Sequence, residues 1–147
     1  MGSTLPKETL YQGFAWEESY GFPQAVKVGD TIYVSGQIGC DDTGALPDLP
    51  TRDEQGAIVD YSALGPQMAL AYQNAAGVLA GFGATLDDVV EEVLYVLNSP
   101  EAFAVGGEIR KAAYGRPDPQ PSSTIIGTTG LAVPDALIEI KFIARVG

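Results

Sequence analysis

The stretch ALIEIKF at residues 136–142 places one carboxylate, Glu139, inside a run of apolar side chains. The run predicts a buried strand, in which a carboxylate is costly unless it is paired, hydrated or used in chemistry. Alternate side chains of a strand point to opposite faces of its sheet, so Ile138, Ile140 and Phe142 share the face opposite Glu139. That apolar face is expected to pack under helices. Glu139 is therefore expected on the open face of the sheet.

Two shorter strands are predicted before it, at 24–29 and 31–38, with hairpin chemistry at Gly29 and Asp30 between them. In the second strand the alternation predicts an apolar face and an open face. The apolar face is assigned Ile32, Val34, Ile38 and the small Gly36, and the open face Tyr33, Ser35 and Gln37.

The rest of the chain predicts two helices and further strands. A helix is expected over 62–82 with Ser62 as N-cap, and a second over 100–115. Strands are expected at 87–98, 122–131 and 136–145. The order predicts one α+β sandwich over 1–147, with two helices on one face of one mixed sheet. Residues 1–15 are interpreted as a flexible N-terminal segment, and 40–61 as a long acidic loop with room for a hairpin near Gly56.

Composition excludes several classes of function. The 147 residues carry a net charge of −11 with only eight Lys and Arg, so neither nucleic acid nor an anionic membrane is an expected partner. No apolar run approaches the roughly 20 residues of a membrane span, and the N-terminus lacks the apolar core of a signal peptide. A cytoplasmic location is the expectation.

Histidine is absent, and Cys40 is the only cysteine. These counts exclude a Ser-His-Asp triad, a Cys-His pair, an intrachain disulfide and the usual zinc sites, and no metal site is predicted. Cys40 itself is interpreted as a passive thiol, since no imidazole can activate it.

The open face is expected to be half apolar. Leu137, Ile143, Tyr33 and Leu94 are assigned to it, and an exposed patch of this kind usually marks an interface. The sheet is therefore predicted to mediate homo-oligomerisation, with Glu139 at or near a subunit boundary.

Four segments taken together resemble the RidA/YjgF/UK114 family: AVKVGDTIYVSGQIG (25–39), the helix around Gln73 and Asn74, GATLDDVVEEVLYV (83–96) and SSTIIGTTGLAVPDALIEIKFIA (122–144). The resemblance implies a chorismate-mutase-like fold and a homotrimer built around a central barrel, with clefts between subunits. It also implies hydrolysis of reactive imines or enamines without metal or cofactor.

The resemblance implies the site residues as well. The family's water-orienting glutamate falls on Glu139, and two substrate contacts fall on Phe22 and Ser35. The arginine that grips a substrate carboxylate in active members falls on Ser123, which cannot neutralise an anion. Ser123 or Thr124 is expected to orient the substrate instead. The expected ligand is a small molecule that is neutral or less acidic than an amino acid.

Several alternatives stay open on the sequence. Glu139 can be a structural residue held by Lys141, Arg145 or another subunit. Arg116 can reach into the cleft in place of the missing arginine, although a connector arginine usually faces solvent. The protein can also be a non-catalytic trimer that binds a small ligand, or one with a regulatory or chaperone-like role.

Overall fold

The main sheet has six strands in the computed structural model, which describes residues 2 and 4–147. In spatial order these strands are β1 (Glu8–Leu10), β2 (Ala25–Val28), β3 (Thr31–Gln37), β8 (Ile138–Arg145), β6 (Val89–Val96) and β7 (Ser122–Gly127). All neighbours are antiparallel except β6 and β7, which are parallel because a helix connects them. The predicted mixed α+β sheet is confirmed.

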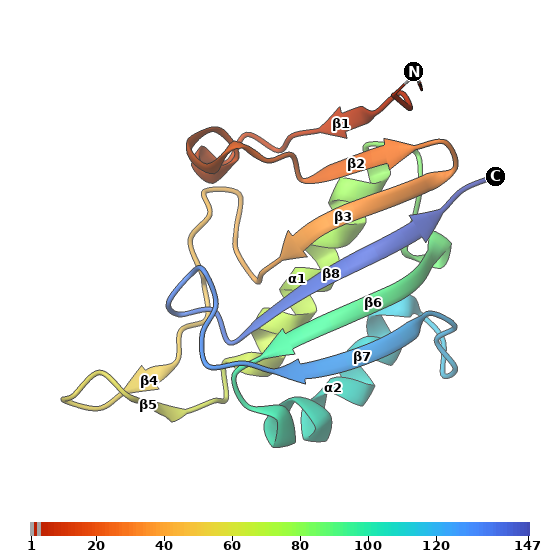
Figure 1. The fold of residues 1–147 in the computed structure, drawn as a ribbon. Coiled ribbons are helices and arrows are strands. Elements are labelled where there is room, and N and C mark those ends of the chain that lie inside the picture. Colours follow the sequence, from red (N-terminus) through yellow and green to blue (C-terminus); the bar gives the residue numbers. More distant parts are fainter. Residues whose placement is uncertain (1, 3) are drawn as a thin grey trace.

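Two long helices, α1 (Leu64–Ala80) and α2 (Ser99–Tyr114), cover one face of this sheet and leave the other open (Figure 1). The predicted cap of the first helix is wrong, because the helix begins after Ala63 with no side-chain cap. The Ser62 amide instead donates to Asp60 at 2.7 Å. Asn98 caps α2 by accepting from the Glu101 amide at 3.0 Å, and Gly115 ends this helix at a left-handed φ of 69°.

The core lies between the helices and the covered face of the sheet. As predicted, Ile138, Ile140 and Phe142 of β8 are buried there. The assignment of Leu94 and Leu137 to the open face is wrong. Leu94 pairs in register with Ile140 and therefore shares its face, while Leu137 precedes the strand and is fully buried in the same core.

The segment 40–61 contains the short hairpin that the sequence suggested around Gly56, formed by β4 (Thr51–Arg52) and β5 (Ile58–Asp60). It lies beyond the end of the main sheet (Figure 1). Arg52 fixes the hairpin to the loop before β8, since its guanidinium contacts Asp135 at 2.9 Å and donates to the Pro134 carbonyl at 2.9 Å.

The fully buried Gln67 of α1 connects the same two loops. Its Nε2 donates to the carbonyls of Asp48 and Asp135, each at 2.9 Å, and its Oε1 accepts from the Leu137 amide at 2.8 Å. One side chain therefore holds the acidic loop and the entry to β8 against the helix.

The N-terminal part contains two elements that the sequence analysis did not predict. β1 extends the sheet beyond β2, and a single π-helical turn, η1 (Glu17–Gly21), follows it. Another short turn, the 3₁₀-helix η2 (Leu86–Asp88), precedes β6. The flexibility expected at positions 1 and 3 lies outside the described residues. Over residues 2 and 4–147, no helix is both long enough and apolar enough to cross a membrane.

Candidate active site

A bulge in β3 shapes the surface beside Glu139. The β3–β8 register pairs Val34 with Phe142 but Gln37 with Ile140, so the bulge inserts one extra residue on β3. The assignment of Gly36 to the apolar side and of Gln37 to the open side is therefore wrong, because alternation fails across the bulge. A Cβ atom added to Gly36 would overlap the Glu139 carboxyl group. Only glycine leaves room for this carboxylate.

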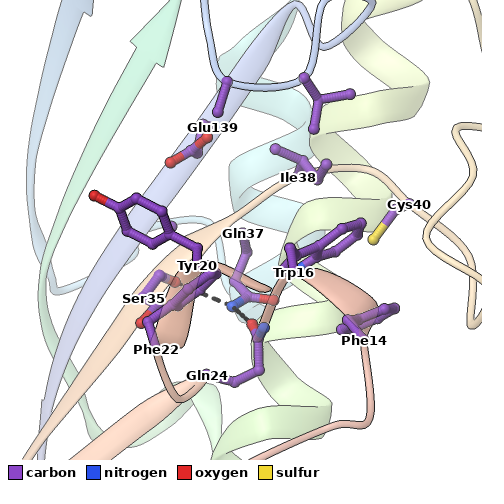
Figure 2. Close-up of a pocket in the computed structure, with 13 residues that line it drawn as sticks. Phe14, Trp16, Tyr20, Phe22, Gln24, Ser35, Gln37, Ile38, Cys40 and Glu139 are labelled. Atoms are coloured by element: carbon purple, nitrogen blue, oxygen red, sulfur yellow. Dashed lines mark hydrogen bonds between the residues drawn. The ribbon is translucent and has the colours of Figure 1, made fainter. Parts of the chain in front are cut away.

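Glu139 opens into a cavity of about 740 Å³. The cavity lies between the bulge, the segment around η1 and the loop before β8, and Figure 2 shows the carboxylate and several aromatic rings around the same space. Its lining comprises Phe14, Trp16, Tyr20, Phe22, Gln24, Ser35, Gly36, Gln37, Ile38, Cys40, Ala132, Val133 and Glu139. Three predicted site residues, Phe22, Ser35 and Glu139, thus line one cavity.

The aromatic wall comes from residues 14–22. The Phe14 and Trp16 rings stack with centroids 4.7 Å apart, and Tyr20 and Phe22 meet edge to face at 5.8 Å. The buried Glu17 carboxylate holds the turn before them, because it accepts from the backbone amides of residues 12 and 13 at 2.9 and 3.0 Å. Sequence analysis missed Phe14, Trp16 and Tyr20, although four aromatic residues in FAWEESYGF were a visible signal.

The polar side chains that line the cavity already form hydrogen bonds within the protein. The Ser35 hydroxyl donates to the Pro23 carbonyl at 2.7 Å, so toward a ligand it can only accept. Gln37 Nε2 donates to Gln24 Oε1 at 2.8 Å and to the Ser35 carbonyl at 3.0 Å (Figure 2). This pair fixes the amides behind the cavity.

Glu139 is the only charged residue of this lining, and burial raises the pKa of its carboxyl group. Burial is the sole cause of that shift, since no cation or hydrogen-bond donor of the described chain contributes to it. Arg145, one of the structural partners considered above, instead contacts Asp30 at 2.8 Å. A half-buried carboxylate without such a partner is a common feature of sites that move protons.

Cys40 also lines the cavity, at the start of the acidic loop. The thiol is buried, and burial raises its pKa, which favours the unreactive protonated form. The Asn74 amide of α1 donates to the carbonyls of Ile38 and Cys40, each at 2.9 Å, and so holds the chain that leaves the cavity.

Ser123 and Thr124 are not part of this cavity within one chain. They lie on β7, separated from β8 by the strand β6. Ser123 pairs in register with Glu92 and donates its hydroxyl to that carboxylate at 2.6 Å, toward the helices. Thr124 is exposed and pairs with Val93 of β6, which in turn pairs with Lys141 of β8. Lys141 is two residues from Glu139 on the same strand, so the two side chains share a face. Thr124 therefore shares the open face with Glu139, and Ser123 does not.

Glu92 is the centre of a buried cluster that sequence analysis missed. Its fully buried carboxylate accepts from Tyr72 at 2.8 Å, Tyr114 at 2.7 Å, Arg110 at 2.8 Å and Ser123 at 2.6 Å. Burial, and then the Glu92 charge, raise the pKa of both tyrosines, so both hydroxyls remain protonated donors. The cluster joins α1, α2, β6 and β7.

The alternative cation Arg116 contacts Asp118 at 3.0 Å, two residues along the same connector. Within residues 2 and 4–147, no group of three or more Cys, Asp or Glu side chains is arranged to hold a metal ion.

Comparisons with known proteins agree with this fold. The sequence model of the family described as “Endoribonuclease L-PSP” matches residues 15–146. The chain is 30% identical to the RutC family protein YjgH of Escherichia coli over 85% of this chain and 82% of that protein. It is 29% identical to a 2-iminobutanoate/2-iminopropanoate deaminase of Dermatophagoides farinae, over 94% of this chain and 95% of that protein. A crystal structure of a YjgF/YER057c/UK114 family member from Mycobacterium tuberculosis superposes with a TM-score of 0.74 at 26% identity, covering 96% of this chain and 100% of that one.

Proposed function

Because this chain belongs to the endoribonuclease L-PSP family, also called YjgF/YER057c/UK114, we propose that it hydrolyses a reactive imine or enamine without metal or cofactor. The observation that carries the proposal is Glu139, a half-buried carboxylate with a raised pKa in a 740 Å³ cavity. The related imine deaminase of Dermatophagoides farinae supports the reaction class.

Glu139 acts as the proton carrier in this reaction. A water molecule attacks the electrophilic imine carbon, a C–O bond forms, and the π pair of the C=N bond moves to nitrogen. Glu139 takes a proton from the attacking water and gives it to nitrogen, which yields a carbinolamine. Glu139 then moves a second proton, from the carbinolamine hydroxyl group to nitrogen, the C=O bond forms as the C–N bond breaks, and ammonia leaves. The products are a carbonyl compound and ammonia, and no oxidant or reductant is consumed. A raised pKa suits both halves of this exchange, because it brings the carboxyl group nearer the working pH.

The cavity is proposed to be completed by a second copy of the chain in a homotrimer. β7 is exposed along its whole length, and the exposed Tyr33 and Ile126 lie on the open face of the sheet. Thr124, on that face of β7, is the residue through which a neighbouring copy would orient the substrate. RNA is not an expected substrate, because the net charge of −11 repels a phosphate backbone.

Turnover tests the proposal directly. An amino-acid oxidase acting on phenylalanine generates an imino acid in situ, and an amine oxidase acting on benzylamine generates an imine without a carboxylate. Loss of imine and release of ammonia are followed by mass spectrometry above the spontaneous rate. We expect acceleration by the wild type and a loss of about 10²–10⁴-fold in Glu139→Gln. Glu91→Gln, which removes an exposed carboxylate, is the matched control and should retain the rate. Equal rates in the two variants, or no acceleration of any imine, would refute the proposal.

A second candidate is a trimer that binds a small ligand without turnover. It is favoured by the predominantly apolar lining and by Ser123, whose hydroxyl is engaged by Glu92. Saturable binding in the absence of any catalysed hydrolysis would identify this case.

A further inference from the structure

The charges of the cavity select against an anionic ligand. None of its lining residues, all of them within the described chain, is a Lys or an Arg, and Glu139 is the only charged side chain among them. The chain as a whole carries −11. A ligand carboxylate would therefore be desolvated beside a carboxylate of the same sign, which is unfavourable.

A second copy offers no free arginine to offset this charge. Each arginine of the chain contacts a carboxylate of the same chain: Arg52 with Asp135, Arg110 with Glu92, Arg116 with Asp118 and Arg145 with Asp30. Arg110, which shares the partner Glu92 with Ser123, also donates to the Pro121 carbonyl at 2.6 Å.

The aromatic wall favours a cation. Four rings in the segment 14–22 line the cavity opposite Glu139 (Figure 2). Aromatic faces carry a negative quadrupole, and cages of such rings bind organic cations. A planar N–H cation can also donate charge-assisted hydrogen bonds to a carboxylate. Ser35, whose hydroxyl proton is engaged by Pro23, can accept a further one.

We infer that the cavity takes a flat organic cation without a carboxylate group, an aryl- or alkyl-substituted iminium or amidinium whose N–H groups face Glu139. The inference rests on the proposed function and specifies its substrate class. In the hydrolysis given above, the substrate is then the protonated imine, which is also its more electrophilic form.

Three nearly isosteric probes separate charge from shape: benzamidinium (+1), benzamide (neutral) and benzoate (−1). Trp16 is the only tryptophan of the chain and lines the cavity, so its fluorescence reports on binding at this site alone. We expect benzamidinium to bind wild-type protein about tenfold to a hundredfold more tightly than benzamide, and benzoate to bind most weakly. Glu139→Gln should reduce benzamidinium affinity to about that of benzamide and leave benzamide within about twofold. Glu91→Gln removes the same charge from an exposed site and should change neither.

The inference is overturned if benzoate binds as tightly as benzamidinium, if Glu139→Gln and Glu91→Gln behave alike, or if no probe binds saturably. The ranking of the three probes on wild-type protein decides the question even where Glu139→Gln folds poorly. The outcome is also distinct from that of the turnover test. If benzamidinium binds but no imine is hydrolysed, the proposed function is refuted and the cationic ligand class stands. If imines are hydrolysed but benzoate binds tightly, the cationic ligand class is refuted and the proposed function stands.

Discussion

Replacing Glu92 by glutamine should destabilise the protein severely without touching the cavity. The glutamine keeps the shape of the side chain and can still accept from Tyr72 and Tyr114. Its amide nitrogen, however, would face the Arg110 Nε–H donor that now lies 2.8 Å from the carboxylate. The substitution therefore removes a buried charge-assisted hydrogen bond. It also places two N–H donors, the glutamine amide and the Arg110 guanidinium, next to each other without an acceptor.

The burial of the Glu92–Arg110 ion pair sets the expected loss in the free energy of unfolding. Removing one partner of a buried ion pair costs about 3–5 kcal/mol. The Arg110 side chain is 19% exposed and can recover part of its hydration, which favours the lower end, about 3 kcal/mol. For a domain of this size that loss lowers Tm by about 6–12 °C.

Urea and thermal unfolding followed by circular dichroism measure the loss, at one fixed protein concentration because oligomerisation shifts apparent stability. Glu91→Gln, the exposed neighbour on the same strand, should stay within about 0.5 kcal/mol of wild type. In the double variant Glu92→Gln/Arg110→Gln the uncompensated charge is gone, so its loss should be smaller than the sum of the two single losses. If Glu92→Gln were as stable as Glu91→Gln, the argument that this cluster holds the helices to the sheet would be refuted.

Three further predictions concern the cavity and its walls. Glu139→Gln should raise the free energy of unfolding at neutral and alkaline pH, because burial raises the pKa of Glu139 in the folded state. The contribution of Glu139 to stability is complete below the ordinary glutamate pKa of about 4.3. It is lost as the pH rises through the pKa of the folded state. Unfolding curves from pH 3 to 8 check this, and a constant difference between the proteins would contradict it. Gly36→Ala should reduce imine hydrolysis by about 10²-fold, because the new methyl displaces the Glu139 carboxyl group; Gly107→Ala on α2, where an added Cβ meets no atom within 4 Å, is its control and should retain full activity. Arg52→Ala should speed amide hydrogen exchange in the loop before β8 while leaving β6 protected, since it frees the hairpin from Asp135; unchanged exchange in that loop would show that Gln67 alone holds it.

The sequence predicted features that depend on local periodicity. The two-residue alternation of β8 was enough to place Ile138 and Ile140 in the core and Glu139 on the other face. It failed in β3, because the bulge at Ser35 and Gly36 adds one residue and no local pattern announces it.

The missed residues have partners far away in the chain. Glu91 and Glu92 stand side by side and look alike, yet only Glu92 is buried, since its four donors come from residues 18 to 31 positions away. The aromatic wall was missed for another reason. Phe14 and Trp16 precede η1 and Tyr20 lies within it, and this single turn has too few residues to show a period.

Gln67 has a consequence for how this fold can diversify. All three of its hydrogen bonds go to main-chain atoms, the carbonyls of Asp48 and Asp135 and the amide of Leu137. Nearly any amino acid can present those atoms, so this tie places almost no demand on the sequence of the loops it holds. New segments can be exchanged into 40–61 or 128–136 and still be held in place. The strands that position Glu139 can thus stay constant while the amino acids of the two loops change. One fold can then acquire different ligands by changes in these loops alone.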